Sequence, residues 1–216
     1  MNKVIEQIGK LGVVPVVAIE DAADAPRLGQ ALMAGGLPCA EITFRTAAAE
    51  SAIRAMATEY PDMLVGAGTV LTVNQAERAL SAGAKFIVTP GFDAAVVDWC
   101  LSHELPITPG VMTPTEINLA LNKGLKLLKF FPAEAAGGIK TLKAIGGPYV
   151  GVSFIPTGGI GVHNLADYLR LPMVHACGGS WLVKKQLIAE GEFKQIEKLT
   201  AAAVKLVQEI RGENHD

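Results

Sequence analysis

Three charged residues interrupt apolar segments of the sequence and could take part in chemistry. Lys129 lies inside LLKFF, and Glu41 and Arg45 lie four residues apart in CAEITFR. Charged side chains are seldom fully buried unless a partner compensates them. Brought together, an amine, a carboxylate and a guanidinium would provide a nucleophile, an acid–base group and an anchor for a carboxylate.

The CAEITFRT segment has the alternation of a strand with one polar face. Side chains of a strand alternate between its two faces, so Glu41, Thr43 and Arg45 share one face and Ile42 and Phe44 the other. If the apolar pair packs against helices, the polar residues point into the interior of the sheet. A structural ion pair is the alternative, since pairing also makes an inward charge tolerable.

The same alternation applies to the segment that contains Lys129. Leu128 and Phe130 take one face, so Lys129 points inward, where Glu41 is its natural counterion. Apolar surroundings and a nearby cation such as Arg45 disfavour the ammonium form, and the free amine can attack a ketone to form a Schiff base. A metal-free aldolase cleaves carbon–carbon bonds in this way. The alternative is a buried lysine that is held only by a salt bridge.

Short apolar segments alternate with longer Ala- and Leu-rich segments from end to end. Eight strands are expected, at residues 13–19, 39–44, 63–69, 85–90, 105–110, 127–132, 152–157 and 173–178. Eight helices are expected between and after them, at about 21–34, 46–58, 72–82, 93–102, 114–122, 138–145, 163–169 and 194–210. MNKVIEQIGKLG predicts an additional amphipathic helix at the N-terminus.

Strands that are continuous apolar runs suit a parallel sheet that is covered on both faces. The count of eight predicts an α/β fold, a (β/α)8 TIM barrel that forms one domain over residues 1–216. An open doubly wound sheet is the alternative. It is not favoured, because GAGTVL does not match the GxGxxG nucleotide pattern and no P-loop is present.

Two glycine pairs follow the seventh and eighth expected strands, in PTGGIG and CGGSWL. Loops at these places often bind phosphate in such barrels, because glycine lets the backbone N–H groups approach an anion. We therefore expect a phosphate site at Gly158 and Gly159 in one loop and at Gly178, Gly179 and Ser180 in the other, where SWLV would start a short helix, although ordinary turns remain the alternative. At other strand ends, Thr69 and Pro90 either line the pocket or belong to turns; a turn is favoured for Pro90.

Composition excludes several classes of partner and site. A net charge of −2 without a basic run disfavours nucleic acid and anionic membrane, and no apolar run reaches the roughly 20 residues that span a bilayer. Three scattered cysteines indicate reduced thiols in a cytoplasmic protein: Cys39, Cys100 and Cys177. Metal is disfavoured, because the histidines are dispersed: His103, His163, His175 and His215.

Six motifs, in this order, closely resemble the bacterial 2-keto-3-deoxy-6-phosphogluconate (KDPG) aldolase family: AEITFRT, VGAGTVL, VTPGF, LKFFPAEAAGG, PTGGI and GGSWL. That family also includes 4-hydroxy-2-oxoglutarate aldolase activity, and the resemblance spans about residues 12–183. It implies a class I aldolase on a (β/α)8 barrel, without a cofactor and usually trimeric. The implied substrates are a phosphorylated 2-keto acid and pyruvate.

The resemblance also implies a role for each motif residue. Lys129 would form the Schiff base, Glu41 would be the general acid and base through a bound water, and Arg45 would bind the pyruvyl carboxylate. Thr69 and Pro90 would border the carboxylate. The phosphate end would comprise Gly158, Gly159, Gly179 and Ser180, with Thr157 beside the substrate hydroxyls.

Two other hypotheses stay open from the residues alone. One is a phosphosugar isomerase or synthase on a TIM barrel that uses Glu41 and Lys129 without a covalent intermediate. The other is a catalytically silent barrel that only binds phosphosugars.

Overall fold

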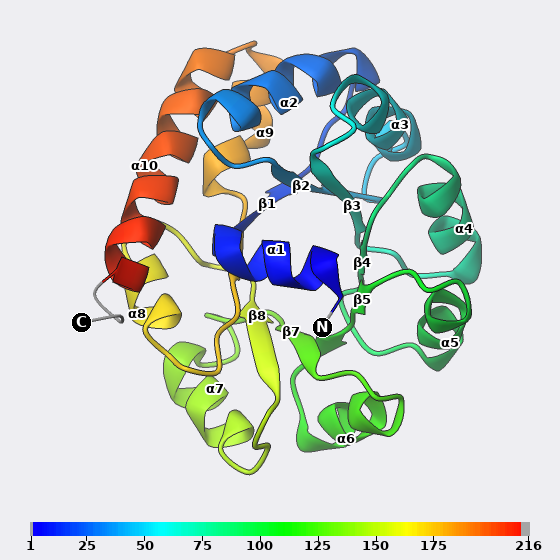
Figure 1. The fold of residues 1–216 in the computed structure, drawn as a ribbon, viewed down its shortest axis with the longest axis vertical. Helices are drawn as coiled ribbons and strands as arrows, with labels where there is room; N and C mark the ends of the chain where they lie inside the picture. The colour runs from blue at the N-terminus through cyan, green and yellow to red at the C-terminus, as the bar shows by residue number, and fades with distance from the viewer. Residues whose placement is uncertain (1, 213–216) are drawn as a thin grey trace.

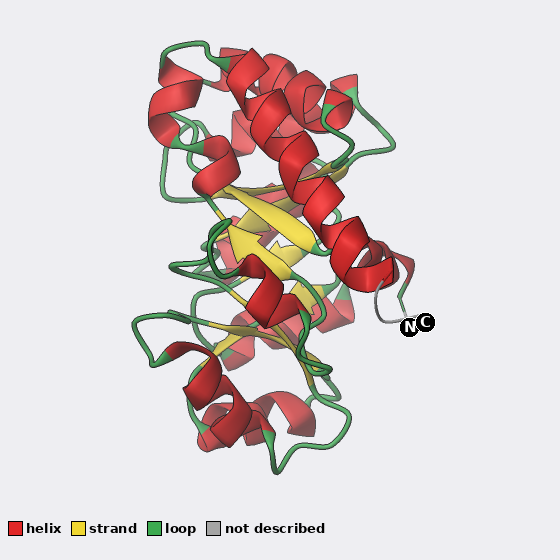
Figure 2. Ribbon diagram, turned by 90° about the vertical axis from the view of Figure 1, so that its left-hand side faces the viewer, coloured by secondary structure: helices red, strands yellow, loops and turns green. Residues whose placement is uncertain are grey.

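The structure, a computed structural model, describes residues 2–212. A curled parallel sheet occupies the middle of the molecule, helices enclose it, and helix α1 (Lys3–Leu11) crosses its centre in the view of Figure 1. Figure 2 shows the strands between helices from the side. The α/β class and the N-terminal helix expected from the sequence are confirmed.

The strands are parallel, as continuous apolar runs predict. Six of them form one sheet in the order β5–β4–β3–β2–β1–β9, and three form a second sheet in the order β6–β7–β8. Their bounds are β1 Val13–Val17, β2 Cys39–Thr43, β3 Leu64–Gly68, β4 Ile87–Val88, β5 Ile107–Thr108, β6 Gly110–Val111, β7 Leu127–Phe130, β8 Ser153–Pro156 and β9 Cys177–Gly179.

The two sheets adjoin each other at both edges. Pro109 alone separates β5 from β6, and isolated bridges between Phe154 and Val174 and between Thr157 and Gly178 connect β8 with the β9 segment. The expected single ring of eight uninterrupted strands is not confirmed, because the hydrogen-bonded strands form an open, curled six-stranded sheet and a separate three-stranded sheet.

Several strands are shorter than the sequence pattern suggested. The strands expected at 85–90 and 105–110 contain ladders of only two residues each, with β6 as a separate piece. Proline has no N–H to donate to a ladder, and Pro90, Pro106 and Pro109 limit these strands. The strand expected at 173–178 begins at Cys177, because Val174 closes a turn onto Leu171.

Most helices lie outside the sheet at the expected places. Their bounds are α2 Ala25–Ala34, α3 Ala49–Glu59, α4 Val73–Ser81, α5 Ala94–Ser102, α6 Pro114–Asn122, α7 Gly138–Gly146, α8 Leu165–Leu169 and α10 Phe193–Gly212. Thr72, Asp93 and Thr113 cap three of them by accepting a backbone N–H, which explains their sharp starts. The first turn of the helix expected at 21–34 is the 3-10 helix η1 (Ala22–Asp24), and the pattern missed the short helix α9 (Lys185–Ala189).

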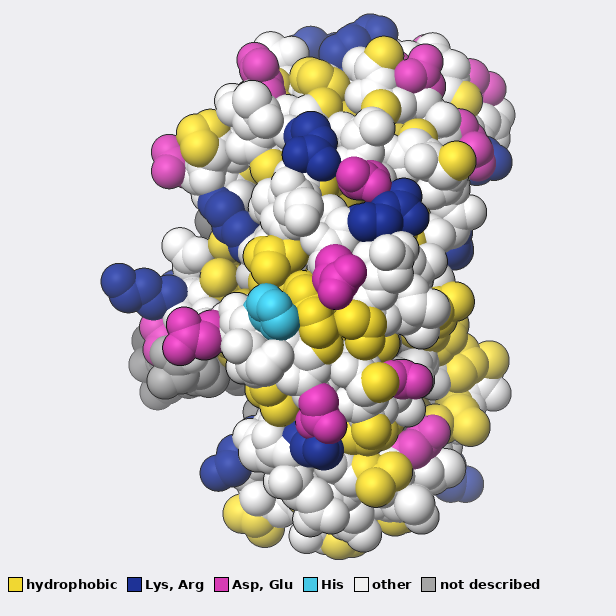
Figure 3. Space-filling model, turned by 90° about the vertical axis from the view of Figure 1, so that its right-hand side faces the viewer, with side chains coloured by type: hydrophobic (Ala, Val, Ile, Leu, Met, Phe, Trp, Pro, Cys, Tyr) yellow, Lys and Arg dark blue, Asp and Glu magenta, His cyan; other side chains and the backbone are white. Residues whose placement is uncertain are grey.

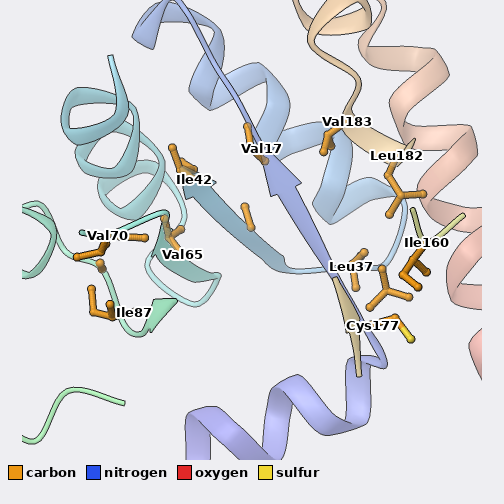
Figure 4. Close-up of a cluster of buried hydrophobic side chains, with 14 of the residues drawn as sticks. Val17, Leu37, Ile42, Val65, Val70, Ile87, Ile160, Cys177, Leu182 and Val183 are labelled. Atoms are coloured by element: carbon orange, nitrogen blue, oxygen red, sulfur yellow. The ribbon is translucent and has the colours of Figure 1, made fainter. Parts of the chain in front are cut away.

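The main core lies between the sheet and the outer helices. Ile42, Leu128 and Phe130 are completely buried in it, as strand alternation predicted for the outward face. Figure 4 shows part of this core, where Val17 and Ile42 extend from β1 and β2. Polar residues that alternate with these side chains consequently point to the opposite, inner face.

A second apolar cluster fills the inner face near the amino ends of the strands. Ile8 of α1 packs there with Val14, Cys39 and Leu64, which lie at or near the first residues of β1, β2 and β3. Helix α1 therefore covers this end of the interior, and the carboxyl ends of the strands are left for the site. Among the described helices, none is both long and apolar enough to cross a membrane.

Candidate active site

Lys129 on β7 and Glu41 on β2 meet inside the curled sheet. Their side chains are 6% and 3% exposed, and Lys129 Nζ lies 3.6 Å from Glu41 Oε1. This distance is too long for a hydrogen bond, and Oε1 has no hydrogen-bond partner among the described residues. A buried carboxylate oxygen that is not engaged is available to exchange protons with a molecule bound at the amine.

Burial raises the pKa of Glu41 above its ordinary value, because desolvation disfavours the charged carboxylate. The nearby cations Lys129 and Arg45 oppose this effect and lower the pKa, Lys129 more strongly. The carboxyl is thus set to gain and lose protons at a higher pH than an exposed glutamate.

Gly68 on β3 provides the space for the Glu41 carboxylate. It pairs with Thr43 of β2, and a Cβ at this position would lie 2.1 Å from Glu41 Oε1. A larger residue would push the carboxylate from its place. Below the pair, a cavity of about 10 Å³ is lined mainly by apolar residues, including Ile8 and Phe86.

A pocket of about 270 Å³ opens above Lys129 at the carboxyl ends of the strands. It contains every site residue predicted from the sequence except Glu41, which adjoins it through Lys129: Arg45, Thr69, Pro90, Lys129, Thr157, Gly158, Gly159, Gly178, Gly179 and Ser180. Residues from β2, β3, β7, β8 and β9 or directly after them thus converge on one pocket.

Arg45 is held at the pocket wall by its own strand face. Its Nε donates to Thr43 Oγ1 at 3.1 Å, and that hydroxyl donates to the carbonyl of Val17 at 2.7 Å. The close ionic partner of Glu41 is Lys129. The geometry therefore favours a guanidinium that faces a bound ligand. It does not favour the alternative, a structural ion pair between Glu41 and Arg45.

The loop after β8 is a glycine turn with two successive positive φ angles. Gly158 and Gly159 have φ angles of 101° and 78°, which side chains rarely tolerate. The Gly158 carbonyl accepts from the N–H of Glu134, and the Gly159 carbonyl accepts from Asn164 Nδ2. The N–H groups of Gly159 and Ile160 donate to no described residue, so they are available for an anion.

Two more features of the pocket follow from its backbone. Thr69 has a φ of 54°, a left-handed conformation that is uncommon for a threonine and occurs at sites of function. The short helix expected to start in SWLV is the 3-10 helix η2 (Trp181–Val183). Gly179 packs so closely on Trp181 that a Cβ would lie 1.6 Å from the indole ring.

Three lining residues were not predicted as site residues: Val16, Phe131 and Ile160. Phe131 contacts the amine, since Lys129 Nζ lies 5.2 Å from the centre of its ring. Strand alternation could have indicated it, because Phe131 shares the inward face of Lys129. Val16 and Ile160 are ordinary apolar residues in the sequence, and no local signal marks them.

Other predicted features lie away from the pocket. His175 Nε2 contacts the carbonyl of Ile5 at 2.8 Å, as a satisfied structural histidine does. His215 lies outside the described residues, and within 2–212 no three His, Cys, Asp or Glu side chains gather at a possible metal site. A larger hollow of about 910 Å³ beside α1 lacks a buried charged pair, since Glu104 and Lys126 there are exposed.

Residues 4–199 match the sequence profile of the family described as "Aldolase: KDPG and KHG aldolase". The chain belongs to the KDPG and KHG aldolase family. It is 48% identical over 207 residues to a 2-dehydro-3-deoxy-phosphogluconate aldolase of Treponema pallidum, covering 96% of this chain and 99% of the relative. It is 44% identical to the KHG/KDPG aldolase of Escherichia coli K12, covering 89% and 90%.

Solved structures of KDPG aldolases have a fold similar to that of this chain. The KDPG aldolase of Legionella pneumophila, with pyruvate captured as a covalent carbinolamine, has a TM-score of 0.90 and 39% identity to this chain. The match covers 94% of this chain and 98% of that one. The resemblance that the sequence motifs indicated is confirmed.

Proposed function

We propose that the protein is a class I aldolase that reversibly cleaves 2-dehydro-3-deoxy-6-phosphogluconate to pyruvate and glyceraldehyde 3-phosphate. The observation that carries the proposal is the buried pair of Lys129 Nζ and Glu41 Oε1, 3.6 Å apart, at the base of a pocket with glycine loops at its rim. Membership of the family and the pyruvate carbinolamine in the Legionella relative support the same reaction.

The first half of the reaction forms the imine. The unprotonated amine of Lys129 attacks the C2 ketone, and the resulting carbinolamine loses its hydroxyl as water. Glu41 takes and returns the protons of these steps, for which its unengaged Oε1 is suitably placed. No metal or cofactor is required, because the protonated imine is itself the electron acceptor.

The second half breaks the bond between C3 and C4. Glu41 removes the proton of the C4 hydroxyl, C4 becomes the aldehyde of glyceraldehyde 3-phosphate, and the bond electrons move to C3 and the imine as an enamine. Protonation of C3 and hydrolysis of the imine then release pyruvate and the free lysine.

The two ends of the pocket fit the two charged ends of this substrate. We assign the carboxylate to Arg45, whose guanidinium can donate two parallel hydrogen bonds, with Thr69 and Pro90 beside it. The phosphate belongs to the glycine loops at the rim, and Thr157 lies between, at the level of the hydroxyls: the loop residues are Gly158, Gly159, Gly179 and Ser180. Such anchoring at both ends aligns C2 with the amine.

The same pocket accommodates a shorter substrate, 4-hydroxy-2-oxoglutarate, which would yield pyruvate and glyoxylate. The name of the Escherichia coli relative, KHG/KDPG aldolase, supports this second activity. An isomerase or synthase without a covalent intermediate is not favoured, because neither use would need an amine placed for imine formation.

For the molecule as a whole, we propose one (β/α)8 barrel domain over residues 1–216 in a cytoplasmic homotrimer. The short Pro109 connection and the bridges to the β9 segment support closure of the two sheets into one barrel. One large core that extends from β1 to α10 supports a single domain. The number of three subunits and the cytoplasmic location are expectations from the family resemblance.

Borohydride trapping with pyruvate tests the Schiff base. Peptide mapping should find the reduced three-carbon adduct on Lys129, and Lys129→Met should lose both the adduct and cleavage. Lys126→Met, which removes an exposed lysine from the same segment, should retain both. A folded wild-type protein that cannot be trapped, or that is trapped at another lysine, would refute the proposal.

A further inference from the structure

Glu134 and Tyr168 form a contact beneath the glycine loop that the reaction steps do not use. Glu134 lies four residues after the end of β7, and Tyr168 is a fully buried residue of α8. The Tyr168 hydroxyl donates a short hydrogen bond to Glu134 Oε1. Burial and this hydrogen bond raise the pKa of the tyrosine, so the hydroxyl keeps the proton that it donates.

The backbone around the pair is shaped to admit it. A Cβ at Gly138 would lie 2.9 Å from Glu134 Oε1 and 3.3 Å from the Tyr168 hydroxyl. Gly138 has a φ of 61°, and Gly137 before it has a φ of 102°. These glycines leave room for a carboxylate to reach a buried hydroxyl from a turn at the surface.

Glu134 also supports the loop directly. Its N–H donates to the carbonyl of Gly158 at 3.1 Å. Its Cβ and Cγ pack on Gly159, where an added Cβ would lie 2.6 Å from both atoms. On the other side, Asn164 holds the Gly159 carbonyl, so the loop is held between two supports. Both of its carbonyls thereby point into protein, and the N–H groups after them are left for an anion.

The charge of Glu134 makes the tyrosine contact more than a packing detail. A carboxylate so close to Gly159 would oppose a phosphate that binds to the same loop, since like charges at short distance repel. The hydrogen bond from Tyr168 holds the carboxylate on the side of Gly138. It therefore fixes the stem of Glu134 under the loop and keeps its charge away from the anion.

We propose that Glu134 and Tyr168 are positioning residues for the phosphate end of the substrate, acting through the Gly158–Gly159 loop. The inference rests on the proposed function, because it assumes that the loop binds the phosphate. The pair should affect binding of the phosphate and not the chemistry at Lys129, because neither Glu134 nor Tyr168 contacts that lysine.

Two measurements distinguish these parts. Steady-state cleavage of 2-dehydro-3-deoxy-6-phosphogluconate reports KM and kcat with the phosphate present. Exchange of deuterium from solvent into the methyl group of pyruvate reports enamine formation at Lys129 without any phosphate.

Tyr168→Phe and Glu134→Ala should each raise KM for the phosphorylated substrate about tenfold, the usual effect of losing a hydrogen bond to a charged group. Their kcat and their rate of pyruvate exchange should stay near the wild-type values. Glu134→Gln keeps an oxygen that accepts from Tyr168 and should therefore restore a KM close to that of the wild type. Tyr149→Phe removes a tyrosine hydroxyl that donates to Pro114 elsewhere and should change nothing.

An unchanged KM in both Tyr168→Phe and Glu134→Ala would overturn the inference. A parallel loss of pyruvate exchange would overturn it too, because it would indicate general damage to the fold. If Tyr168→Phe does not fold, the Glu134 variants at the surface carry the test. Failure of the proposed function would be evident beforehand, as a wild-type protein that neither cleaves the substrate nor exchanges pyruvate.

Discussion

At the scale of single residues, the site is a compromise between burial and charge. Lys129 and Glu41 are both almost completely buried, and their separation of 3.6 Å leaves Glu41 Oε1 without a hydrogen-bond partner among the described residues. Because the folded protein raises the pKa of Glu41, the folded state binds the proton more firmly than the unfolded state. Glu41 therefore stabilises the folded protein most at low pH. Its contribution to the free energy of unfolding decreases as the pH rises from the ordinary pKa of glutamate to the raised pKa of Glu41 in the folded protein.

The raised pKa of Glu41 predicts the acid limb of the pH profile. Cleavage needs Glu41 as a carboxylate at the C4 hydroxyl, so kcat/KM should fall as the pH decreases. The apparent pKa of this fall should lie above the ordinary pKa of glutamate. Glu41→Gln should lower kcat about 10²- to 10⁴-fold and remove this limb, whereas Glu20→Gln at an exposed position should preserve it. A limb that persists in Glu41→Gln would assign the titration to another group.

At the scale of elements, helix α1 closes the end of the sheet below the site. Ile8 contributes to the apolar cluster at the amino ends of the strands and lines the small cavity that also touches Glu41 and Lys129. Asn2 caps the start of the helix, since its side chain accepts the N–H of Val4, and Gly12 caps its end in a left-handed conformation. The caps fix the ends of the helix, and Ile8 within it is 1% exposed, packed over the inner face.

Ile8→Ala should therefore weaken both the fold and the setting of Glu41. Loss of a buried isoleucine side chain costs about 2–5 kcal/mol, which urea unfolding would measure. Water that enters the enlarged cavity would move the pKa of Glu41 toward its ordinary value, so the acid limb of kcat/KM should shift to lower pH. Ile145→Ala, at a half-buried position of α7, is the matched control. If the acid limb of the kcat/KM profile stays at the wild-type pH in Ile8→Ala, helix α1 does not influence the pKa of Glu41.

At the scale of the whole molecule, one face exposes apolar side chains. Figure 3 shows hydrophobic side chains among charged ones on the face that carries α4 and α5. Leu80, Leu101 and Leu119, from α4, α5 and α6, are 37%, 40% and 45% exposed. Helix α5 is apolar on almost every side, as is usual for a helix that is covered on more than one face.

This face is where we expect the subunits of the proposed homotrimer to associate. Leu101→Glu places a charge on it and should lower the mass measured by sedimentation toward that of a single chain. Val150→Glu, at a side chain that is 99% exposed near the start of β8, is the control and should leave the mass unchanged. A wild-type protein that sediments as a single chain would refute the assembly itself.

The sequence by itself determined which side chains point into the sheet and which loops carry glycine pairs. Alternation along a strand is a local property, so the inward direction of Glu41 and Lys129 could be read without a structure. The glycine pairs were equally visible, and both now line the pocket. Strand length was less predictable, because a proline removes a donor without changing the apolar pattern.

Only the tertiary structure decided how these residues meet. The 3.6 Å between Lys129 and Glu41 depends on the curvature of the sheet, and the place of the carboxylate depends on Gly68 of a neighbouring strand. Tyr168 and Glu134 are 34 residues apart, and neither has a local signal for the other. Local patterns determine direction along one strand or helix, whereas distances between elements follow from how all the layers pack together.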